Sequence, residues 1–219
     1  LENEFTYYER QCDTSDITTR SLDDLTIRVD DDRDDTTTRA ASVEAVETFM
    51  RHGAVVVPRL LGEDTAEELR EHILKRNGEL TADESIPLDG AENRFSYGIG
   101  VNEHPTVTKA LQEISSSPLL IKSLTHLLGP NPAIVEITAI TAQYGAQDQG
   151  WHSDVKADGN SVKYSRTFTH SYSLFIPLQN VTKEMGATEI CPGTHYCPDD
   201  MGDSCSEFGF PAVPQVGDV

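Results

Sequence analysis

The sequence has no apolar run that approaches the ~20 residues of a membrane-spanning helix, and it has few positive charges. Its 219 residues include 17 Lys and Arg against 37 Asp and Glu, which gives a net charge of -20. A chain this acidic repels phosphate backbones and anionic membrane surfaces. We therefore expect no membrane span and no nucleic-acid partner, and we interpret the acidic excess as a solubilising surface.

Cysteine is also scarce. Four cysteines are too few for a disulfide scaffold in a chain of this length. Three of them cluster at Cys191, Cys197 and Cys205, and Asn180-Val181-Thr182 is a sequon for N-glycosylation. These two features keep an oxidising compartment open, although the sequence favours a cytoplasmic or organellar location over a secreted one. The sequence alone decides neither the compartment nor the disulfide state of the cluster.

Domain organisation follows from length and local composition. A chain of 219 residues can bury one full hydrophobic core. Residues 1–40 are polar and rich in Asp and Thr, with a charge run over residues 30–35 that offers nothing to bury. We expect residues 1–40 to form an acidic arm or a disordered leader, and residues 41–219 to form one domain.

Helix signals dominate the first half of that domain. Acidic residues crowd the start of the segment from Glu63, and Lys75 and Arg76 lie at its end, an order that complements the helix dipole. Ser117 and Pro118 are typical of an N-cap and a first helical residue. The predicted helices cover residues 43–52, with Ser42 as cap and Gly53 as terminator, and residues 63–76, 105–114 and 118–128, the last followed by Gly129.

Extended patterns prevail in the second half. After a short buried strand predicted over residues 54–58, alternating apolar residues over 134–141 predict a strand of a sheet packed on both faces. Residues 171–178 and 187–191 are predicted to form further strands. Helices followed by strands predict an α+β fold in which a helical layer packs on a sheet or a β-barrel.

One histidine motif differs from the other histidines. His152 and Asp154 follow a predicted strand and a short glycine-containing loop, and an extended segment points residues i and i+2 to the same side. One imidazole and one carboxylate make up two thirds of the facial triad that holds iron(II) and leaves positions open. A chain of this composition contains about 0.6 such pairs by chance, so the surrounding sequence has to support the assignment.

The surrounding sequence supplies signatures in a defined order. The first is an opening helix and strand over Phe49 to Leu61, and the second is Gly150 to Asp154, with an aromatic residue before His-x-Asp. A later strand over Ser173 to Leu178 comes next. A glycine turn over Glu184 to Glu189 and a Pro-Gly-Thr-His segment over Cys191 to His195 follow. In this order they resemble the phytanoyl-CoA dioxygenase-like family of iron(II)- and 2-oxoglutarate-dependent oxygenases. The resemblance extends from about residue 42 to the end of the sequence.

The resemblance implies a double-stranded β-helix core, the jelly-roll or cupin-like architecture, with an N-terminal helical layer. It implies that His152 and Asp154 hold iron(II), that 2-oxoglutarate and O2 are co-substrates, and that an unactivated C–H bond of a small molecule is hydroxylated. The carboxylate at Asp154 favours hydroxylation over halogenation. Thr141, Gln143 and Ser173 are candidates for holding the co-substrate, because relatives use polar groups at such places.

The resemblance also implies a third ligand, a histidine, and an arginine that binds 2-oxoglutarate, both downstream of a strand that begins at Gly217 to Val219. Neither lies within the 219 residues, so the domain is expected to be incomplete at its C-terminal end. We expect a continuation of the chain, or a second polypeptide, to complete the barrel. The alternative is a non-catalytic oxygenase-like domain that lacks the third ligand and serves as a structural or interaction module.

Other metal arrangements find less support in the sequence. His195 is an alternative ligand, although the family pattern places this residue near the pocket rather than on the metal. Cys191, His195, Cys197 and Cys205 are residue types that zinc accepts, but their spacings match no familiar zinc pattern. His52, His72 and His126 are expected to be structural, since they lie in helical patterns without partners at ligand spacing, and His104 is expected in a loop.

Overall fold

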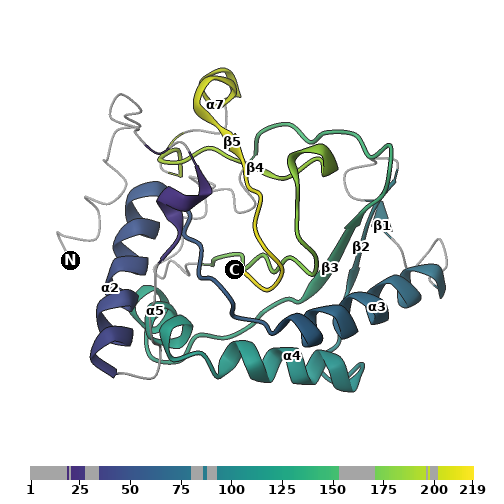
Figure 1. Cartoon of the computed structure of the whole chain (residues 1–219), viewed down its shortest axis with the longest axis horizontal. Helices are drawn as coiled ribbons and strands as arrows, with labels where there is room; N and C mark the ends of the chain where they lie inside the picture. Colours follow the sequence, from purple (N-terminus) through teal and green to yellow (C-terminus); the bar gives the residue numbers. More distant parts are fainter. Residues whose placement is uncertain are drawn as a thin grey trace, which may run out of the picture.

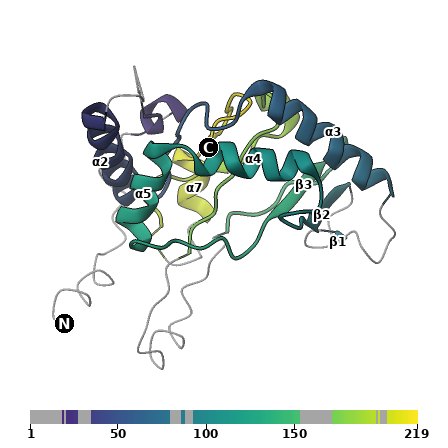
Figure 2. The same cartoon turned by 90° about the horizontal axis from the view of Figure 1, so that it is seen from below.

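The computed structural model describes Thr19 and residues 21–27, 35–79, 86–87, 93–152, 171–195, 197 and 202–219. These residues form five α-helices, two short 3-10 helices and five short strands, and every strand pairing is antiparallel. The fold is therefore mixed α+β, as predicted, with most helices along the left and lower margins of Figure 1 and the strands and extended segments beside them (Figures 1 and 2). The described strands form no closed barrel, so the jelly-roll core stays a prediction.

Helix α2 (Asp35–His52) is longer than predicted and buries a different face. Ser42 is a fully buried residue inside the helix, where its hydroxyl donates to the Arg39 carbonyl oxygen at 2.8 Å, so its prediction as the N-cap is wrong. Small residues form the buried face, and the apolar side chain of Val43 is 42% exposed. Gly53 ends the helix as predicted, with a positive φ of 78° that disfavours other residues.

Part of the predicted arm belongs to the folded unit. The 3-10 helix η1 (Leu22–Leu25) places Leu25 in full burial, and Ile27 is only 1% exposed. The backbone of residues 25–27 pairs with Val56 through two hydrogen bonds, at 2.9 and 3.0 Å. Residues 54–58 are therefore extended and buried at Val56 and Val57, but they pair through an isolated parallel bridge rather than a regular strand.

Helices α3 (Glu63–Glu79), α4 (Pro105–Ser115) and α5 (Pro118–Leu128) confirm the local sequence signals. Ser117 caps α5 by accepting a hydrogen bond from the Leu120 N–H, and Gly129 follows its end. His104, predicted in a loop, is the N-cap of α4, and its ring accepts from the Thr106 N–H. The signal for this cap was present in the Pro at the first helical position.

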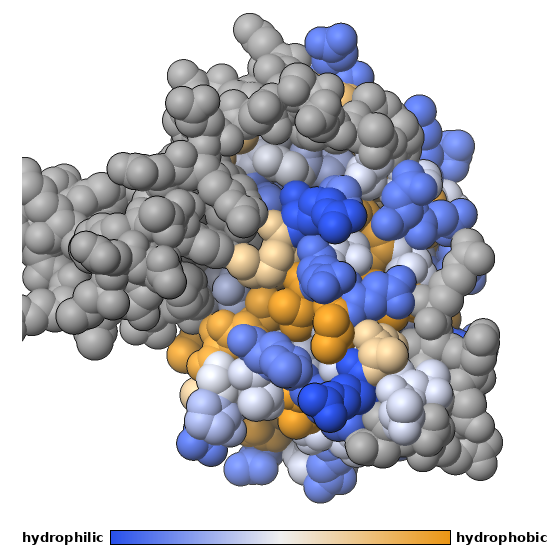
Figure 3. Space-filling model, turned by 90° about the vertical axis from the view of Figure 1, so that its left-hand side faces the viewer, coloured by the Kyte–Doolittle hydropathy of each residue, from blue (hydrophilic) through white to orange (hydrophobic). Residues whose placement is uncertain are grey.

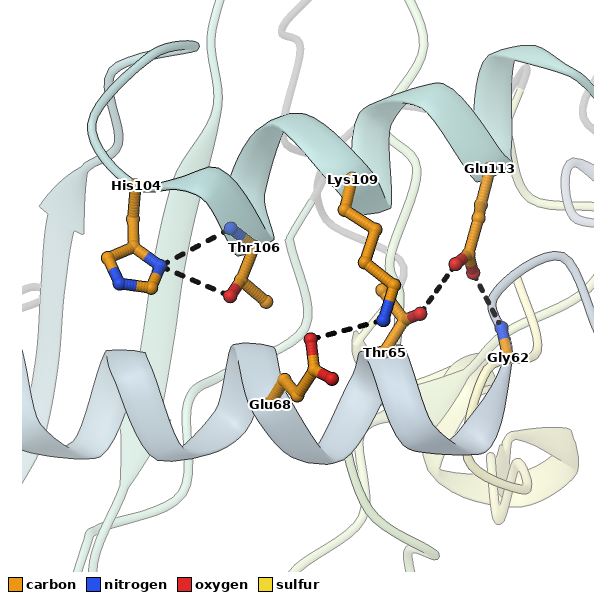
Figure 4. Close-up of polar contacts among 7 residues, drawn as sticks. All are labelled: Gly62, Thr65, Glu68, His104, Thr106, Lys109 and Glu113. Carbon is orange, nitrogen blue, oxygen red and sulfur yellow. Dashed lines mark hydrogen bonds and ion pairs between the residues drawn. The ribbon is translucent and has the colours of Figure 1, made fainter.

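Helices α3 and α4 lie side by side and are joined by polar contacts along their length (Figure 4). The carboxylate of Glu113 on α4 accepts from the Gly62 N–H at 3.1 Å and from the Thr65 hydroxyl at 2.5 Å. Glu113 thus satisfies the backbone N–H of Gly62 and the hydroxyl of Thr65 at the start of α3 from another helix. Further along, Lys109 contacts Glu68 at 3.1 Å.

One three-stranded sheet has the order β1–β2–β3, with β1 (Ile86–Pro87), β2 (Arg94–Gly98) and β3 (Thr138–Ala142). In the register between β2 and β3, Tyr97 faces Ala139, and both residues pack with Ile73 of α3. Helix α3 therefore covers one face of this sheet. Strands β1 and β2 fall in a region that the sequence did not predict to be extended.

Several strand predictions are wrong among the described residues. The strand predicted over 134–141 is confirmed in its second half as β3, but residues 134–137 form no strand, and Val135 is 89% exposed, so this part is not packed on two faces. Residues 171–178 are extended but form no strand, and Phe175 is 62% exposed. The strand predicted over 187–191 is confirmed in a shorter form, as β4 (Glu189–Ile190).

The last part of the chain is held by long-range contacts. Strand β4 pairs with β5 (Phe210–Pro211), and a disulfide joins Cys191, next to β4, to Cys205 on α7 (Gly202–Phe208). Val219 exchanges two backbone hydrogen bonds with Val57, at 2.5 and 2.9 Å. The end of the described chain therefore forms an extended layer against residues 57–61.

The surface that carries α2 shows a hydrophobic patch in its centre, bordered by hydrophilic residues (Figure 3). No helix among the described residues combines the length and the apolar character needed to cross a bilayer.

Candidate functional site

His152 is exposed and lies at the end of the extended loop that follows β3. Its Nδ1 lies 2.7 Å from the Gly150 carbonyl oxygen. Because a carbonyl oxygen only accepts hydrogen bonds, Nδ1 must carry the proton, and in the neutral ring Nε2 then carries the lone pair. Metal-binding histidines are commonly oriented in this way, with the second ring nitrogen donating to a backbone carbonyl. The donor chemistry of His152 therefore fits a metal ligand through Nε2.

Trp151, directly before this histidine, is half-buried and packs against Gly209. A Cβ atom at Gly209 would lie 2.5 Å from Trp151 Cη2 and 2.5 Å from the Cys205 carbonyl oxygen, so only glycine fits here. Cys205 is in turn fixed to Cys191 by the disulfide. The position of the His152 segment thus depends on the packing of Trp151 against the disulfide-bonded region.

Asp154, the second predicted ligand, lies outside the described residues. The pairing of His152 with Asp154 therefore stays a prediction. Within the part of the chain that the structure describes, no cluster of three or more His, Cys, Asp or Glu side chains is arranged to hold a metal ion.

The three predicted co-substrate residues lie in different surroundings. Thr141 accepts a hydrogen bond from Asn77 Nδ2 of α3 at 2.7 Å, which places it on the sheet face that α3 covers. Gln143 is exposed just beyond β3, and its backbone N–H donates to the Asn93 carbonyl oxygen. Ser173 is exposed in the extended segment 171–178, as is Ser171. Their role in co-substrate binding stays a prediction.

Arg94 on β2 is a polar residue that the sequence did not single out. It pairs with Ala142 across the β2–β3 ladder, on the face opposite to Tyr97, Ala139 and α3. Its Nη1 is buried and has no hydrogen-bond partner among the described residues. Burying an unpaired guanidinium nitrogen is costly, so an anion at this face would be stabilised there. Recognising Arg94 required the strand register, since alternation over five residues is a weak signal.

His195 has a structural position. Its Nε2 donates to the Met50 carbonyl oxygen of α2 at 3.2 Å, and its ring packs on Gly53, where a Cβ would lie 2.7 Å from the imidazole. The Gly193 N–H donates to the His52 carbonyl oxygen at 2.8 Å. The Pro-Gly-Thr-His segment therefore donates hydrogen bonds to backbone carbonyls at the C-terminus of α2. These contacts explain the position of the segment without a metal ion.

The zinc arrangement is contradicted by the disulfide. Cys191 and Cys205 are joined to each other, and Cys197 is disulfide-bonded as well, so none of the three offers a thiolate. Zinc binding by cysteine needs the deprotonated thiol.

Two of the helical histidines, His72 and His52, contact other residues of the fold. His72 lies 3.3 Å from Glu103 and stacks on His104, with ring centroids 4.2 Å apart, at an open groove of about 380 Å³ between α3 and α4. His52 contacts the Thr19 hydroxyl at 3.1 Å. Burial, and then the neighbouring Arg51, lower the pKa of His52, against a smaller opposing effect of Asp24.

Comparison with known proteins does not identify the chain. No protein-family model matches it, and no curated protein shows significant similarity to it.

Proposed function

We propose that this protein is an iron(II)- and 2-oxoglutarate-dependent dioxygenase that hydroxylates a C–H bond of a small molecule, with His152 and Asp154 as two iron ligands. The observation that carries the proposal is the hydrogen bond from His152 Nδ1 to the Gly150 carbonyl oxygen, the contact to a backbone carbonyl that metal-binding histidines commonly make. It occurs within Trp151-His152-Ser153-Asp154, where the sequence resembles the metal motif of the phytanoyl-CoA dioxygenase-like family.

The proposal gives separate roles to His152, Asp154 and Trp151. His152 and Asp154 supply one neutral nitrogen and one anionic oxygen, a donor set that suits iron(II) and leaves coordination positions for other groups. The bound iron, with 2-oxoglutarate and O2, supplies the oxidising chemistry. Trp151, fixed against Gly209, holds the ligand segment in place.

An additional polypeptide segment completes the sheet in this proposal. Strand β3 lies at the edge of its sheet, and its outer edge has no strand partner among the described residues. Ile140 on β3 is 55% exposed and Phe175 of segment 171–178 is 62% exposed. Open strand edges and exposed apolar side chains are the features that a further strand covers. The third ligand would come from the same segment, either a continuation of this chain or a second polypeptide.

The test is binding of iron(II) and 2-oxoglutarate, without oxygen, by the protein as its own cells produce it. Bound together, they are expected to give a charge-transfer absorption and, once O2 and substrate are admitted, succinate. His152→Ala and Asp154→Ala are expected to abolish both signals. His126→Ala is the matched control, because His126 is an exposed histidine on α5, and it is expected to change neither.

Two results would count against the proposal. Iron binding that is unchanged in both ligand variants would remove the role of His152 and Asp154. A folded protein that binds no iron would instead support a non-catalytic structural or interaction module of the same fold.

A further inference from the structure

The sequon Asn180-Val181-Thr182 lies on an exposed loop between the extended segment 171–178 and the 3-10 helix η3 (Lys183–Met185). Both residues that define the sequon, Asn180 and Thr182, are exposed. It is the single sequon in the 219-residue sequence, since none of the other asparagines is followed two residues later by Ser or Thr. Its position meets the first requirement for a modified asparagine, which is an accessible surface loop.

The loop is held in a defined conformation by contacts to two other segments, α3 and residues 214–216. The Arg70 side chain on α3 donates to Gln179 Oε1 at 2.9 Å, and the Val181 N–H donates to the Pro214 carbonyl oxygen at 3.1 Å. The Val216 N–H donates to Asn180 Oδ1 at 2.9 Å.

The last of these contacts orients the Asn180 amide. Its oxygen faces the backbone of Val216, so the amide nitrogen occupies the other branch of the group, and no described residue accepts a hydrogen bond from it. An N-linked glycan is bonded to this nitrogen and leaves the oxygen unchanged. The folded protein can therefore keep the Val216 contact with a glycan attached.

The cysteines give an independent indication of the compartment. Cys191 and Cys205 form a disulfide, and Cys197 is disulfide-bonded too. Structural disulfides form and persist in oxidising compartments and are rare in the cytosol. The lumen of the endoplasmic reticulum is one of the oxidising compartments in which disulfides form, and it is also where sequons are glycosylated, so both observations fit passage through it.

We propose that Asn180 carries an N-linked oligosaccharide, attached while the chain passes through an oxidising secretory compartment. The donor is a lipid-linked oligosaccharide diphosphate supplied by the cell. Asn180 Nδ2 forms a bond to the anomeric carbon of the first sugar and loses one proton, and the lipid diphosphate departs with the bonding electron pair. This inference is independent of the proposed enzymatic function, and it reverses the preference of the sequence for a cytoplasmic or organellar location.

The experiment isolates the protein from its own cells and maps the peptide that contains Asn180 by mass spectrometry, before and after release of N-glycans by an amidase. The expected result is a glycopeptide that the amidase converts to the peptide with Asp at this position. An unmodified Asn180 in protein whose Cys191–Cys205 disulfide is formed would overturn the proposal. So would protein that contains Cys191 and Cys205 as free thiols.

Sequon variants separate glycosylation from other causes of a mass difference. Expressed through a eukaryotic secretory pathway, Asn180→Gln and Thr182→Ala are expected to lose the glycan, and Thr182→Ser is expected to retain it. The Cys191–Cys205 disulfide, measured in each variant, reports folding. A mass difference that persists in folded Asn180→Gln would contradict attachment at Asn180.

Discussion

The helical half and the extended half of this protein are stabilised in different ways. Helices α3, α4 and α5 begin and end at residues whose local signals are visible in the sequence, and they bury apolar residues against one another and the sheet. The segments from residue 171 onwards depend on contacts that are distant in sequence, such as Val219 with Val57 and Cys191 with Cys205. The candidate ligand His152 lies at the junction, held through Trp151 to the second half.

The largest expected effect is on the extended half, from removal of its disulfide. Cys191→Ser with Cys205→Ser frees a loop with a sequence separation of 14 residues, which is expected to lower the free energy of unfolding by about 3 kcal/mol. Hydrogen exchange is expected to accelerate in residues 189–211 and to remain slow in α3 and α4. Equal acceleration in both halves would show that they unfold as one unit.

A smaller loss is expected in the helical half when the cap of α3 is removed. Glu113→Ala leaves the Gly62 N–H and the Thr65 hydroxyl without their acceptor, so the free energy of unfolding is expected to fall by about 1–2 kcal/mol. Gln112→Ala, at an exposed position on the same helix, is the control in chemical denaturation. Equal effects of the two substitutions would show that helix propensity, rather than the cap, is being measured.

Substitution of Tyr97, which packs beneath α3, is expected to change the free energy of unfolding in the opposite direction. Its hydroxyl is buried without a hydrogen-bond partner in the described part of the chain, so Tyr97→Phe is expected to raise the free energy of unfolding by about 1 kcal/mol. Burial, and then Glu103, raise the pKa of Tyr97 to about 12 from 10.0, against an opposing effect of Arg76. Since the folded state favours the neutral phenol, its stabilisation is present below pH 10 and is lost as pH rises towards 12. The melting temperature is expected to fall less with rising pH across this range in Tyr97→Phe than in the unchanged protein. A loss of stability in Tyr97→Phe at neutral pH would show that the hydroxyl has a hydrogen-bond partner.

The smallest effect concerns His52, where α2 meets the Pro-Gly-Thr-His segment. Its lowered pKa means that the unfolded chain binds its proton more readily than the folded protein. Stability is therefore complete above the ordinary pKa of 6.5 and falls as pH drops below that value. His52→Gln is expected to weaken this acid dependence in urea titrations, and His126→Gln is expected to preserve it.

These contrasts explain which parts of the fold the sequence predicts. Ser117, Pro118 and Gly129 set the bounds of α5 through contacts within a few residues, and such local signals are readable. Ser42 misleads because burial by distant residues, not capping chemistry, decides its place in α2. Residues 134–137 and 171–178 have strand-like sequences, but a strand forms only where a partner lies alongside.

The candidate site shows the same division. Alternation and the family resemblance singled out His152, yet neither predicts that its ring donates to Gly150 or that Trp151 needs Gly209. The sequence does not predict the buried guanidinium nitrogen of Arg94, because its surroundings form only when β2 pairs with β3. The family resemblance makes Thr141 a candidate for co-substrate binding, but its hydrogen bond to Asn77 forms only when α3 packs on the sheet.

The most direct test of the central claim is a crystal structure of the protein, prepared with iron(II) under exclusion of oxygen, with diffraction recorded at the iron absorption edge. The account predicts an anomalous peak within bonding distance of His152 Nε2 and the Asp154 carboxylate. A well-ordered segment around Trp151 with no peak between these two side chains, or with iron bound elsewhere, would contradict it.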